Sequence, residues 1–257
     1  QAQNLADSKL EENKVKELNQ LSVSYNKMLG RLSDAFEVQR QFTANAAHEL
    51  RTPLALMQVQ LDSYNSGQHP GSDAETVQTI KMVTEQNDRL SKMVKTLLDM
   101  SELQTVGRDE TIMVDALVDE VLADLEPLAR EKDVELTGNC EAITIVGSDI
   151  LIYRLVYNLV ENAIKYNHPD GSVHIDIKDE NGFALISIKD TGIGIAPENQ
   201  EKIFTPFFCV DKSRSRTMGG AGLGLALVAE IAQLHNGTVY VSESDSEGST
   251  IILKLPL

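Results

Sequence analysis

The sequence is poor in aromatic residues and in cysteine. Its 257 residues contain no Trp, and aromatic residues make up 5% of the chain. Only two cysteines are present, Cys140 and Cys209. Two cysteines cannot form a disulfide framework, and no Cys/His spacing indicates a zinc site. We therefore expect reduced thiols and a core built from Leu, Ile, Val and Met.

Long apolar runs are also missing. No stretch approaches the roughly 18 apolar residues of a membrane-spanning helix, and no signal peptide is visible. The chain begins with Gln1 rather than Met, so we expect it to be a piece of a longer protein.

Basic residues are scarce, above all in the second half. The formal net charge is −16; residues 1–107 carry 11 Lys or Arg against 14 Asp or Glu, and residues 108–257 carry 12 against 25. This acidity argues against broad nucleic-acid binding, which needs a basic surface. An anionic substrate in the second half would need local positive charge from a metal ion or a basic cluster.

The first hundred residues show helical periodicity. Residues 5–66 predict a helix with a heptad seam, and a second helix is predicted from Ser72 or Asp73 to near Gly107. Residues 66–71 are typical of a turn. The seam consists of Leu18, Leu21, Tyr25, Met28 and Leu32, and an apolar stripe follows from Phe42 to Tyr64. Because one helical hairpin buries little surface, we expect two copies to pair into a dimeric four-helix bundle.

From residue 110 the pattern changes to short β-rich runs with apolar helical segments between them. The predicted helices are 115–131, 149–166 and 222–235. The predicted strands are Thr111–Val114, Val134–Thr137, Ile143–Val146, Ser172–Lys178, Ala184–Lys189, Thr238–Ser242 and Thr250–Lys254. This order predicts an α+β two-layer sandwich, with helices on one face of a mixed sheet.

One histidine lies on the polar side of the first helix. At 100° per residue, His48 falls nearly opposite the apolar stripe, so we expect it to be exposed. Glu49 follows it, and Thr52 lies one turn later on the same face. A neutral imidazole has one nucleophilic nitrogen, and a nearby carboxylate can take the proton from the other. The ordinary alternative is a surface His beside a surface Glu, and His69, His168, His174 and His235 remain in that class.

Four segments of the second half suggest a nucleotide site, although each is common by itself. Asn158 and Asn162 share a helix face and carry the oxygen ligands that Mg²⁺ accepts. Asp190 follows a strand and opens a glycine-rich turn, where a carboxylate can accept from the amine of adenine. Glycines at 219–224 run into a helix, whose first amides can meet phosphate. The basic segment 211–216 before them is typical of a mobile lid.

In combination these motifs resemble a known family. Residues 42–54 resemble the phosphoacceptor box of sensor histidine kinases. The Asn helix, the Asp190 turn, the segment 204–208 and the glycine run resemble, in that order, the N, G1, F and G2 boxes of their catalytic domain. That domain belongs to an ATPase superfamily shared with gyrase-type topoisomerases and some chaperones. The resemblance runs from about residue 13 to the C-terminus.

The resemblance implies specific roles. His48 would be the phosphorylated residue, Glu49 would assist it, and Thr52 would serve a reverse, phosphatase reaction. Asn162, helped by Asn158, would hold Mg²⁺. The implied ATP-binding residues are Asn158, Asn162, Lys165, Tyr166, Asp190, Gly192, Gly194, Phe207, Lys212, Arg214, Arg216, Gly220, Gly222, Leu223, Gly224 and Thr250.

The same resemblance implies a domain order and partners. Residues 1–36 would end a HAMP-like relay helix, 37–107 would form the dimerisation and phosphotransfer hairpin, and 108–257 would bind ATP. The partners would be a second copy and a response regulator receiver domain. The chain would be the cytoplasmic portion of a sensor in the inner or plasma membrane.

Two departures and two rival readings remain. Cys209 stands where relatives often carry a basic residue, and residues 13–18 lack the Asp-Glu pair that usually begins the HAMP helix. The chain could instead be a dimeric scaffold that holds nucleotide without turnover. It could also be an enzyme in which phosphatase activity dominates.

Overall fold

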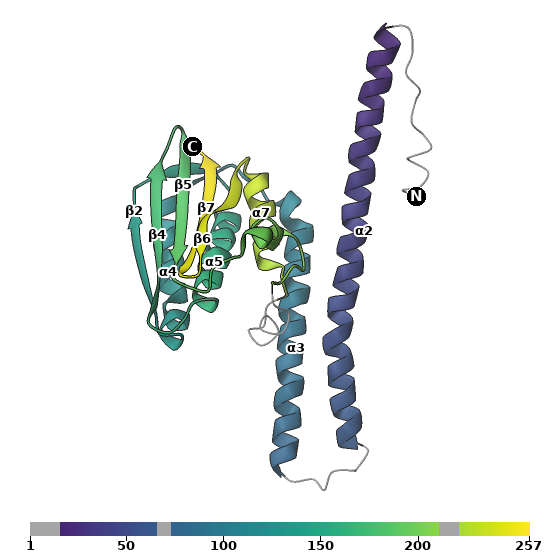
Figure 1. Ribbon diagram of the computed structural model, residues 1–257, viewed down its shortest axis with the longest axis vertical. Helices are drawn as coiled ribbons and strands as arrows, with labels where there is room; N and C mark the ends of the chain where they lie inside the picture. The colour runs from purple at the N-terminus through teal and green to yellow at the C-terminus, as the bar shows by residue number, and fades with distance from the viewer. Residues whose placement is uncertain (1–15, 66–72, 211–220) are drawn as a thin grey trace. The chain divides into compact units, whose positions relative to one another are not determined.

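The computed structural model describes residues 16–65, 73–210 and 221–257 and divides the chain into two compact units, 1–82 and 83–257 (Figure 1). Helix α2 spans Lys16–Asn65, and α3 spans Asp73–Glu102, followed by the short helix η1 at Leu103–Thr105. Both predicted long helices are therefore confirmed over the described residues. Residues 5–15 and the predicted turn at 66–71 lie outside that range.

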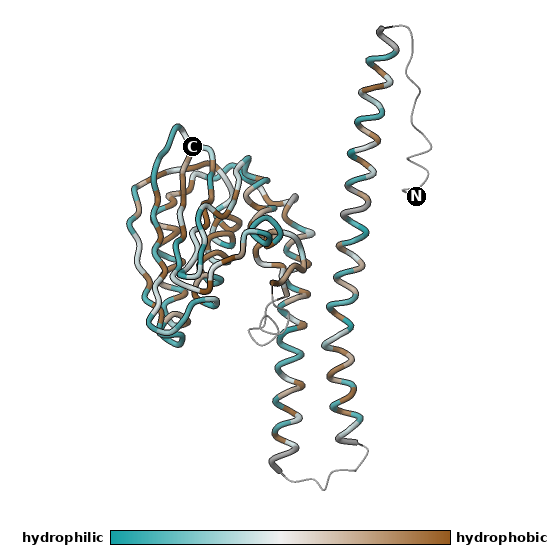
Figure 2. Tube along the Cα trace, in the orientation of Figure 1, coloured by the Kyte–Doolittle hydropathy of each residue, from teal (hydrophilic) through white to brown (hydrophobic). Residues whose placement is uncertain are grey.

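Apolar residues of the long helices stay open to solvent in the single chain. Leu21, Met28 and Leu32 of the predicted seam are 64%, 57% and 43% exposed. Val77 and Ile80 on α3 are at least 60% exposed. Figure 2 shows apolar positions recurring along both helices. In the described part of the chain, no helix has the length and apolarity needed to cross a membrane.

Every predicted element of the second half is present. Five of the strands are two to four residues longer than expected, and the last two helices are shorter. After η1 the order is β1 (Glu110–Met113), α4 (Val114–Glu131), β2 (Val134–Cys140), β3 (Thr144–Gly147), α5 (Asp149–Lys165), β4 (Gly171–Asp179), β5 (Phe183–Asp190), η2 (Pro197–Asn199), η3 (Lys202–Phe204), α7 (Gly224–Leu234), β6 (Thr238–Asp245) and β7 (Gly248–Pro256).

The strands form a mixed sheet, as predicted. Its order is β2-β4-β5-β7-β6, while β1 and β3 form a separate two-stranded ribbon. Only the β2–β4 pair in that sheet is parallel. The β4–β5 hairpin turns through Asn181 and Gly182, both at positive φ (56° and 81°), as a tight hairpin turn requires.

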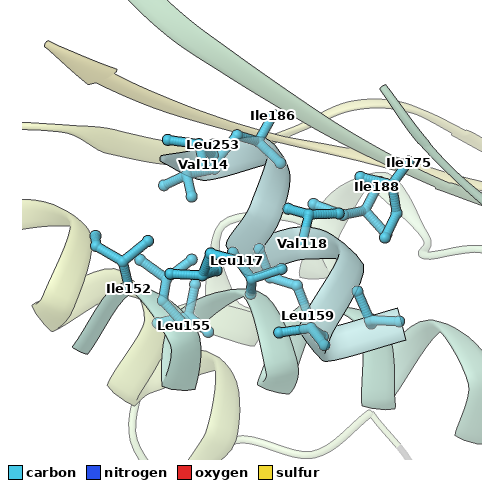
Figure 3. Packing of buried hydrophobic residues seen from close by; sticks show 14 of the residues in the cluster. Val114, Leu117, Val118, Ile152, Leu155, Leu159, Ile175, Ile186, Ile188 and Leu253 are labelled. Atoms are coloured by element: carbon cyan, nitrogen blue, oxygen red, sulfur yellow. The ribbon is translucent and has the colours of Figure 1, made fainter. Parts of the chain in front are cut away.

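Helices α4, α5 and α7 cover one face of this sheet (Figure 1). Inward-facing residues alternate along each strand, because successive side chains point to opposite faces. Figure 3 shows Ile175, Ile186, Ile188 and Leu253 of the strands on the side of the helices, and they form one buried cluster with Val118 of α4 and with Leu155 and Leu159 of α5. All are 2% exposed or less. This buried apolar layer packs α5 against the sheet and so fixes α5 relative to the end of β5.

Candidate functional site

His48 is open to solvent on α2. Its side chain is 72% exposed, as predicted, and the Glu49 side chain beside it is 17% exposed. The His48 Nδ1 atom lies 4.0 Å from Glu49 Oε1. The imidazole is therefore reachable by a large substrate, and a base stands on its Nδ1 side.

Thr52 lies one turn further along the helix. Its hydroxyl donates a hydrogen bond to the carbonyl oxygen of His48, at 3.2 Å. This back-bond is usual for Thr within a helix, and the hydroxyl must rotate before it can donate a hydrogen bond to any other group. Helix α2 continues through Pro53, which is buried.

In the second unit, the Asn face of α5 meets the start of α7. A Cβ added to Gly224 would lie 2.9 Å from Asn158 Oδ1 and 3.9 Å from Asn162 Nδ2. Asn158 is held in place because its Nδ2 donates to the carbonyl of Arg154, at 2.7 Å. Both amides therefore face the glycine at the first position of α7, and a side chain at 224 would obstruct them.

The first turn of α7 suits an anion. The first amides of a helix have no acceptor within that helix, and Leu223 at the N-cap makes no side-chain cap. Leu223 itself is 2% exposed, so its side chain belongs to the core, and only its backbone can serve a ligand. Gly222 before it has φ +68°, and a Cβ there would lie 2.6 Å from the carbonyl oxygen of Phe208.

The segment around Phe207 supports this turn. The Phe207 amide donates to the carbonyl of Gly222 at 2.8 Å. Phe207 adopts φ +64°, which is unusual for a bulky residue. Such strain persists only where the surroundings hold it. Residues 204–208 and 221–224 are thus tied together backbone to backbone.

Lys165 ends α5 beside the Asn face. Its Nζ lies 2.7 Å from Glu161 Oε1, one turn earlier. Lys165 was predicted to border phosphates, and in the described chain its charge is shared with a carboxylate. The next residue, Tyr166, contributes through its carbonyl, which accepts from the Ile193 amide at 3.2 Å.

Asp190 ends β5 on the helix-covered side of the sheet, by the alternation of that strand. Its Oδ1 accepts from the Gly192 amide at 2.8 Å. Burial raises the pKa of this carboxyl above its usual value, and hydrogen bonds from the backbone amides of Gly192 and Ser249 partly offset that rise. Each carboxylate oxygen has two lone pairs, so a half-buried carboxylate that accepts from two backbone amides can still accept from a ligand amine.

The glycines after Asp190 are required by close backbone contacts. A Cβ on Gly192 would lie 2.5 Å from the carbonyl oxygen of Tyr166. Gly194 has φ +66°, and its Cβ would lie 1.7 Å from the carbonyl oxygen of Asp245. The loop is therefore enclosed between the end of α5 and the β6–β7 turn.

The structure does not bring Thr250 to this site. Asp190 pairs with Ser249 across β5 and β7, whereas Thr250 pairs with Lys189. Since cross-strand partners share a face, Ser249 lies on the side of Asp190 and Thr250 on the other. Ser249 is 6% exposed, and its hydroxyl accepts from Ser244 Oγ at 3.3 Å. The sequence alone could not favour Ser249 over Thr250, because that choice depends on the exact register between β5 and β7.

The predicted lid residues Lys212, Arg214 and Arg216, together with Gly220, lie outside the described residues. Cys209 is half-buried just before them. What the structure does bring together is the Asn face of α5, the Asp190 loop and the N-terminus of α7.

Two family profiles match the chain. The His Kinase A (phospho-acceptor) domain matches residues 38–106, and the family of histidine kinase-, DNA gyrase B- and HSP90-like ATPases matches residues 147–257. The first match contains His48, and the second contains all three parts of the site on α5, β5 and α7.

Curated relatives include sensor histidine kinases. RppB of Synechocystis sp. is 36% identical over 231 residues, covering 87% of this chain and 50% of RppB. SenX3 of Mycobacterium tuberculosis is 37% identical over 224 residues, covering 85% of this chain and 54% of SenX3. The chain thus spans about half the length of the curated relatives it matches.

Solved structures share the fold. The Acinetobacter baumannii histidine kinase AdeS superposes with a TM-score of 0.65 at 24% identity, covering 81% of this chain and 97% of that one. The histidine kinase ThkA, in complex with the response regulator TrrA, gives 0.71 at 23% identity, covering 95% and 68%. At these identities the likeness supports the fold, a helical hairpin followed by an α/β sandwich.

Proposed function

The chain belongs to the sensor histidine kinases, and from that premise we propose that it transfers the γ-phosphoryl group of ATP to His48 and then to an aspartate of a response regulator. The proposal rests on two features of the chain. One is an exposed imidazole beside a carboxylate, and the other is a domain in which an Asn face, a half-buried acceptor and a helix N-terminus without a side-chain cap converge.

The nucleotide is held at both ends. Asp190 accepts from the exocyclic amine of adenine; guanine carries a carbonyl there, so it would leave the carboxylate unpaired. The backbone from Gly222 into the first turn of α7, which begins at Gly224, donates amides to phosphate oxygens. Ser249 lies across from Asp190 and supports the base side.

The Asn face suits a magnesium ion. Asn158 Oδ1 lies close to the start of α7, and amide oxygens are among the hard ligands that Mg²⁺ accepts. When bound, the ion neutralises charge that develops on the phosphates. Asn162 and Asn158 are the residues that would hold it. The nearby Lys165 is paired with Glu161, so it adds less positive charge than its sequence position suggested.

At His48, one nitrogen attacks the γ-phosphorus while the bond from that phosphorus to the ADP oxygen breaks. The proton on the other nitrogen must then leave. Glu49 Oε1 stands 4.0 Å from Nδ1, so Nδ1 gives up its proton to Glu49 and Nε2 is the nucleophile. ADP leaves with the electron pair of the broken bond. The N–P bond that forms is labile and passes the group to a carboxylate.

Exposed apolar residues on the long helices favour a homodimer. Leu54, Val59, Val77 and Ile80 are each more than half exposed in the single chain, and a helical hairpin alone buries too little surface to be stable. A second copy would bury these residues in a four-helix bundle and leave His48 on its surface, open to a receiver domain.

A phosphatase role of Thr52 is the second candidate activity. Thr52 shares a face with His48, but its hydroxyl donates to the His48 carbonyl. The hydroxyl would therefore have to rotate before it could donate a hydrogen bond in the reverse reaction. Thr52→Ala should keep autophosphorylation and slow dephosphorylation of the regulator, and dephosphorylation at the wild-type rate would remove Thr52 from the role.

The central test uses His48→Gln and γ-labelled ATP. The variant should lose all acid-labile label while still binding ATP, because the nucleotide site lies in another domain. His174→Gln is the matched control, since His174 is also exposed and should keep full labelling. Label that persists on His48→Gln contradicts the assignment. A wild-type chain that binds ATP but never becomes labelled would favour a scaffold without turnover.

A further inference from the structure

The turn that follows α5 contains another asparagine, Asn167, which lies outside the Asn face and makes several hydrogen bonds. Asn167 Oδ1 accepts from the hydroxyl of Thr191 at 3.1 Å and from the amide of His168 at 3.0 Å. Its Nδ2 donates to the carbonyl of Ser172 at 3.0 Å. Both polar atoms of this side chain are therefore used, and they join three segments of the domain.

Thr191 completes the same set. Its hydroxyl oxygen accepts from the Ser172 amide at 2.8 Å, while its own amide donates to the Ser172 carbonyl at 3.1 Å. Thr191 and Asn167 lie 24 residues apart in sequence. We call the side chains of Asn167 and Thr191, with the backbone of Ser172, the Asn167–Thr191 clasp.

The surrounding backbone is shaped to admit the clasp. A Cβ on Gly171 would lie 2.1 Å from Asn167 Oδ1, so glycine at 171 leaves room for the amide. On the other side, the Ile193 amide donates to the Tyr166 carbonyl at 3.2 Å. The loop 190–193 is thus fastened to the end of α5 at Tyr166 and Asn167, immediately beside Asp190.

We propose that Asn167 and Thr191 are positioning residues for nucleotide recognition: the clasp holds the 190–193 loop so that the Asp190 carboxylate meets adenine. This rests on the proposed function, in which Asp190 selects the base. Without the clasp, the loop populates positions in which Asp190 is displaced, and apparent affinity falls with the fraction that remains competent.

The test is calorimetric titration of the chain with adenosine and with ATP. Thr191→Val removes the hydroxyl at nearly constant volume and should weaken both ligands by the same factor, roughly three- to tenfold. Thr191→Ser keeps the hydroxyl and should bind as the wild type does. Adenosine is the decisive probe because its binding depends neither on phosphate contacts nor on turnover.

A matched control separates positioning from general stability. Thr137 Oγ1 is 2.8 Å from His174 Nδ1 on the exposed face of the sheet, so Thr137→Val also removes one hydroxyl contact in the same domain. It should leave adenosine affinity unchanged. If Thr191→Val binds adenosine as tightly as the wild type while its melting temperature falls, the clasp is merely structural and the proposal is overturned.

Asn167→Asp provides the second variant. It places a carboxylate oxygen against the Ser172 carbonyl, where the amide had donated, and should weaken adenosine as Thr191→Val does. Its control is Asn139→Asp, because Asn139 Nδ2 donates to Asp176 Oδ1 on the exposed face. If Thr191→Val does not fold, equal adenosine affinity of Asn167→Asp and wild type overturns the proposal.

The Asp190→Asn variant separates a failure of the clasp proposal from a failure of the proposed adenine site. If Asp190→Asn loses adenosine binding but Thr191→Val and Asn167→Asp do not, only the clasp is wrong. If Asp190→Asn itself spares adenosine binding, the adenine site is wrong and the clasp proposal falls with it. Parallel losses in all three variants, with rescue by Thr191→Ser, support both.

Discussion

Replacing Asp190 by Asn should affect nucleotide binding and stability in opposite directions. The half-buried carboxylate is unfavourable for the stability of the fold, but nucleotide binding needs it. Burial raises the pKa of Asp190, and the hydrogen bonds from Gly192 and Ser249 offset only part of that rise. A raised carboxyl pKa means that this group stabilises the fold at pH values below the unfolded pKa. That contribution is lost as pH rises through the folded pKa.

At pH 7 the wild-type protein therefore carries a partly desolvated charge that Asn lacks. Asn keeps one oxygen, whose two lone pairs can accept from the Gly192 and Ser249 amides. The ligand-free melting temperature of Asp190→Asn should therefore equal or exceed that of the wild type. Any gain should disappear in acid, once the wild-type carboxyl is protonated. This is the usual signature of a residue retained for function at the expense of stability.

Nucleotide binding should change in the opposite direction. A hydrogen bond to a charged group contributes about 1.5–3 kcal/mol, so ATP and adenosine should both bind roughly 10- to 150-fold more weakly. Titration calorimetry with each ligand, beside thermal melts without ligand, measures both effects. Asp179→Asn is the control, because Asp179 Oδ1 also accepts a backbone amide, from Gly182 at 3.3 Å, in the β4–β5 hairpin. A large drop in ligand-free melting temperature with unchanged adenosine affinity would refute the reasoning.

Three further predictions follow from single positions. Gly194→Ala should abolish ATP binding and destabilise the domain by about 2 kcal/mol or more, because φ is +66° and the new Cβ would lie 1.7 Å from a carbonyl oxygen. The control Gly182→Ala, at φ +81° with nothing within 4 Å, should lower the free energy of unfolding in urea by only about 1 kcal/mol. Equal losses in the two variants would contradict the role of the close contact. Burial lowers the pKa of His235 below 6.5, so the unfolded chain takes up the proton first and the free energy of unfolding should fall as pH drops below about 6.5. In urea titrations at several pH values, His235→Gln should flatten this pH dependence and His174→Gln should not. An unchanged pH dependence in His235→Gln would show that another group is responsible. Burial and the carboxylates of Asp119, Asp115 and Asp176 raise the pKa of Cys140 to about 11. A thiol reagent at pH 8 should therefore label Cys140 slowly in the folded Cys209→Ser variant and rapidly after denaturation, measured by intact-protein mass spectrometry. Equal labelling rates would mean that the thiol is accessible and ionised in the folded protein.

The sandwich could be predicted because each element carries its own periodic signal. Strands β4, β5 and β7 alternate buried residues with more accessible ones, and α5 buries Leu151, Leu155 and Leu159 at helical spacing. The Asp190 turn was also readable, since glycines at 192 and 194 follow a strand directly. Local patterns were sufficient wherever burial is set within one element.

Other parts of the site depend on contacts between elements, which the sequence does not reveal. Ser249 rather than Thr250 faces the side of Asp190, because the β5–β7 register pairs 190 with 249. Lys165 looked available for phosphate, yet Glu161 neutralises it across one helical turn. Asn167 belongs to none of the sequence motifs, and its contacts with Thr191 and Ser172 arise only once the strands bring these residues to it.

The position of Asp190 is set mainly by backbone contacts. Added Cβ atoms would meet the carbonyl oxygen of Tyr166 at Gly192, that of Asp245 at Gly194, and that of Asp190 itself, at 2.0 Å, from Gly248. Each of these contacts excludes every side chain, whatever its chemistry, so glycine is required at all three positions. The clasp then adds the two side chains, Asn167 and Thr191, that hold the loop from the side of α5. A loop that is held by carbonyl contacts and by an amide whose polar atoms are all used can present a partly desolvated carboxylate without collapsing onto it, and that is the arrangement an adenine-binding carboxylate requires.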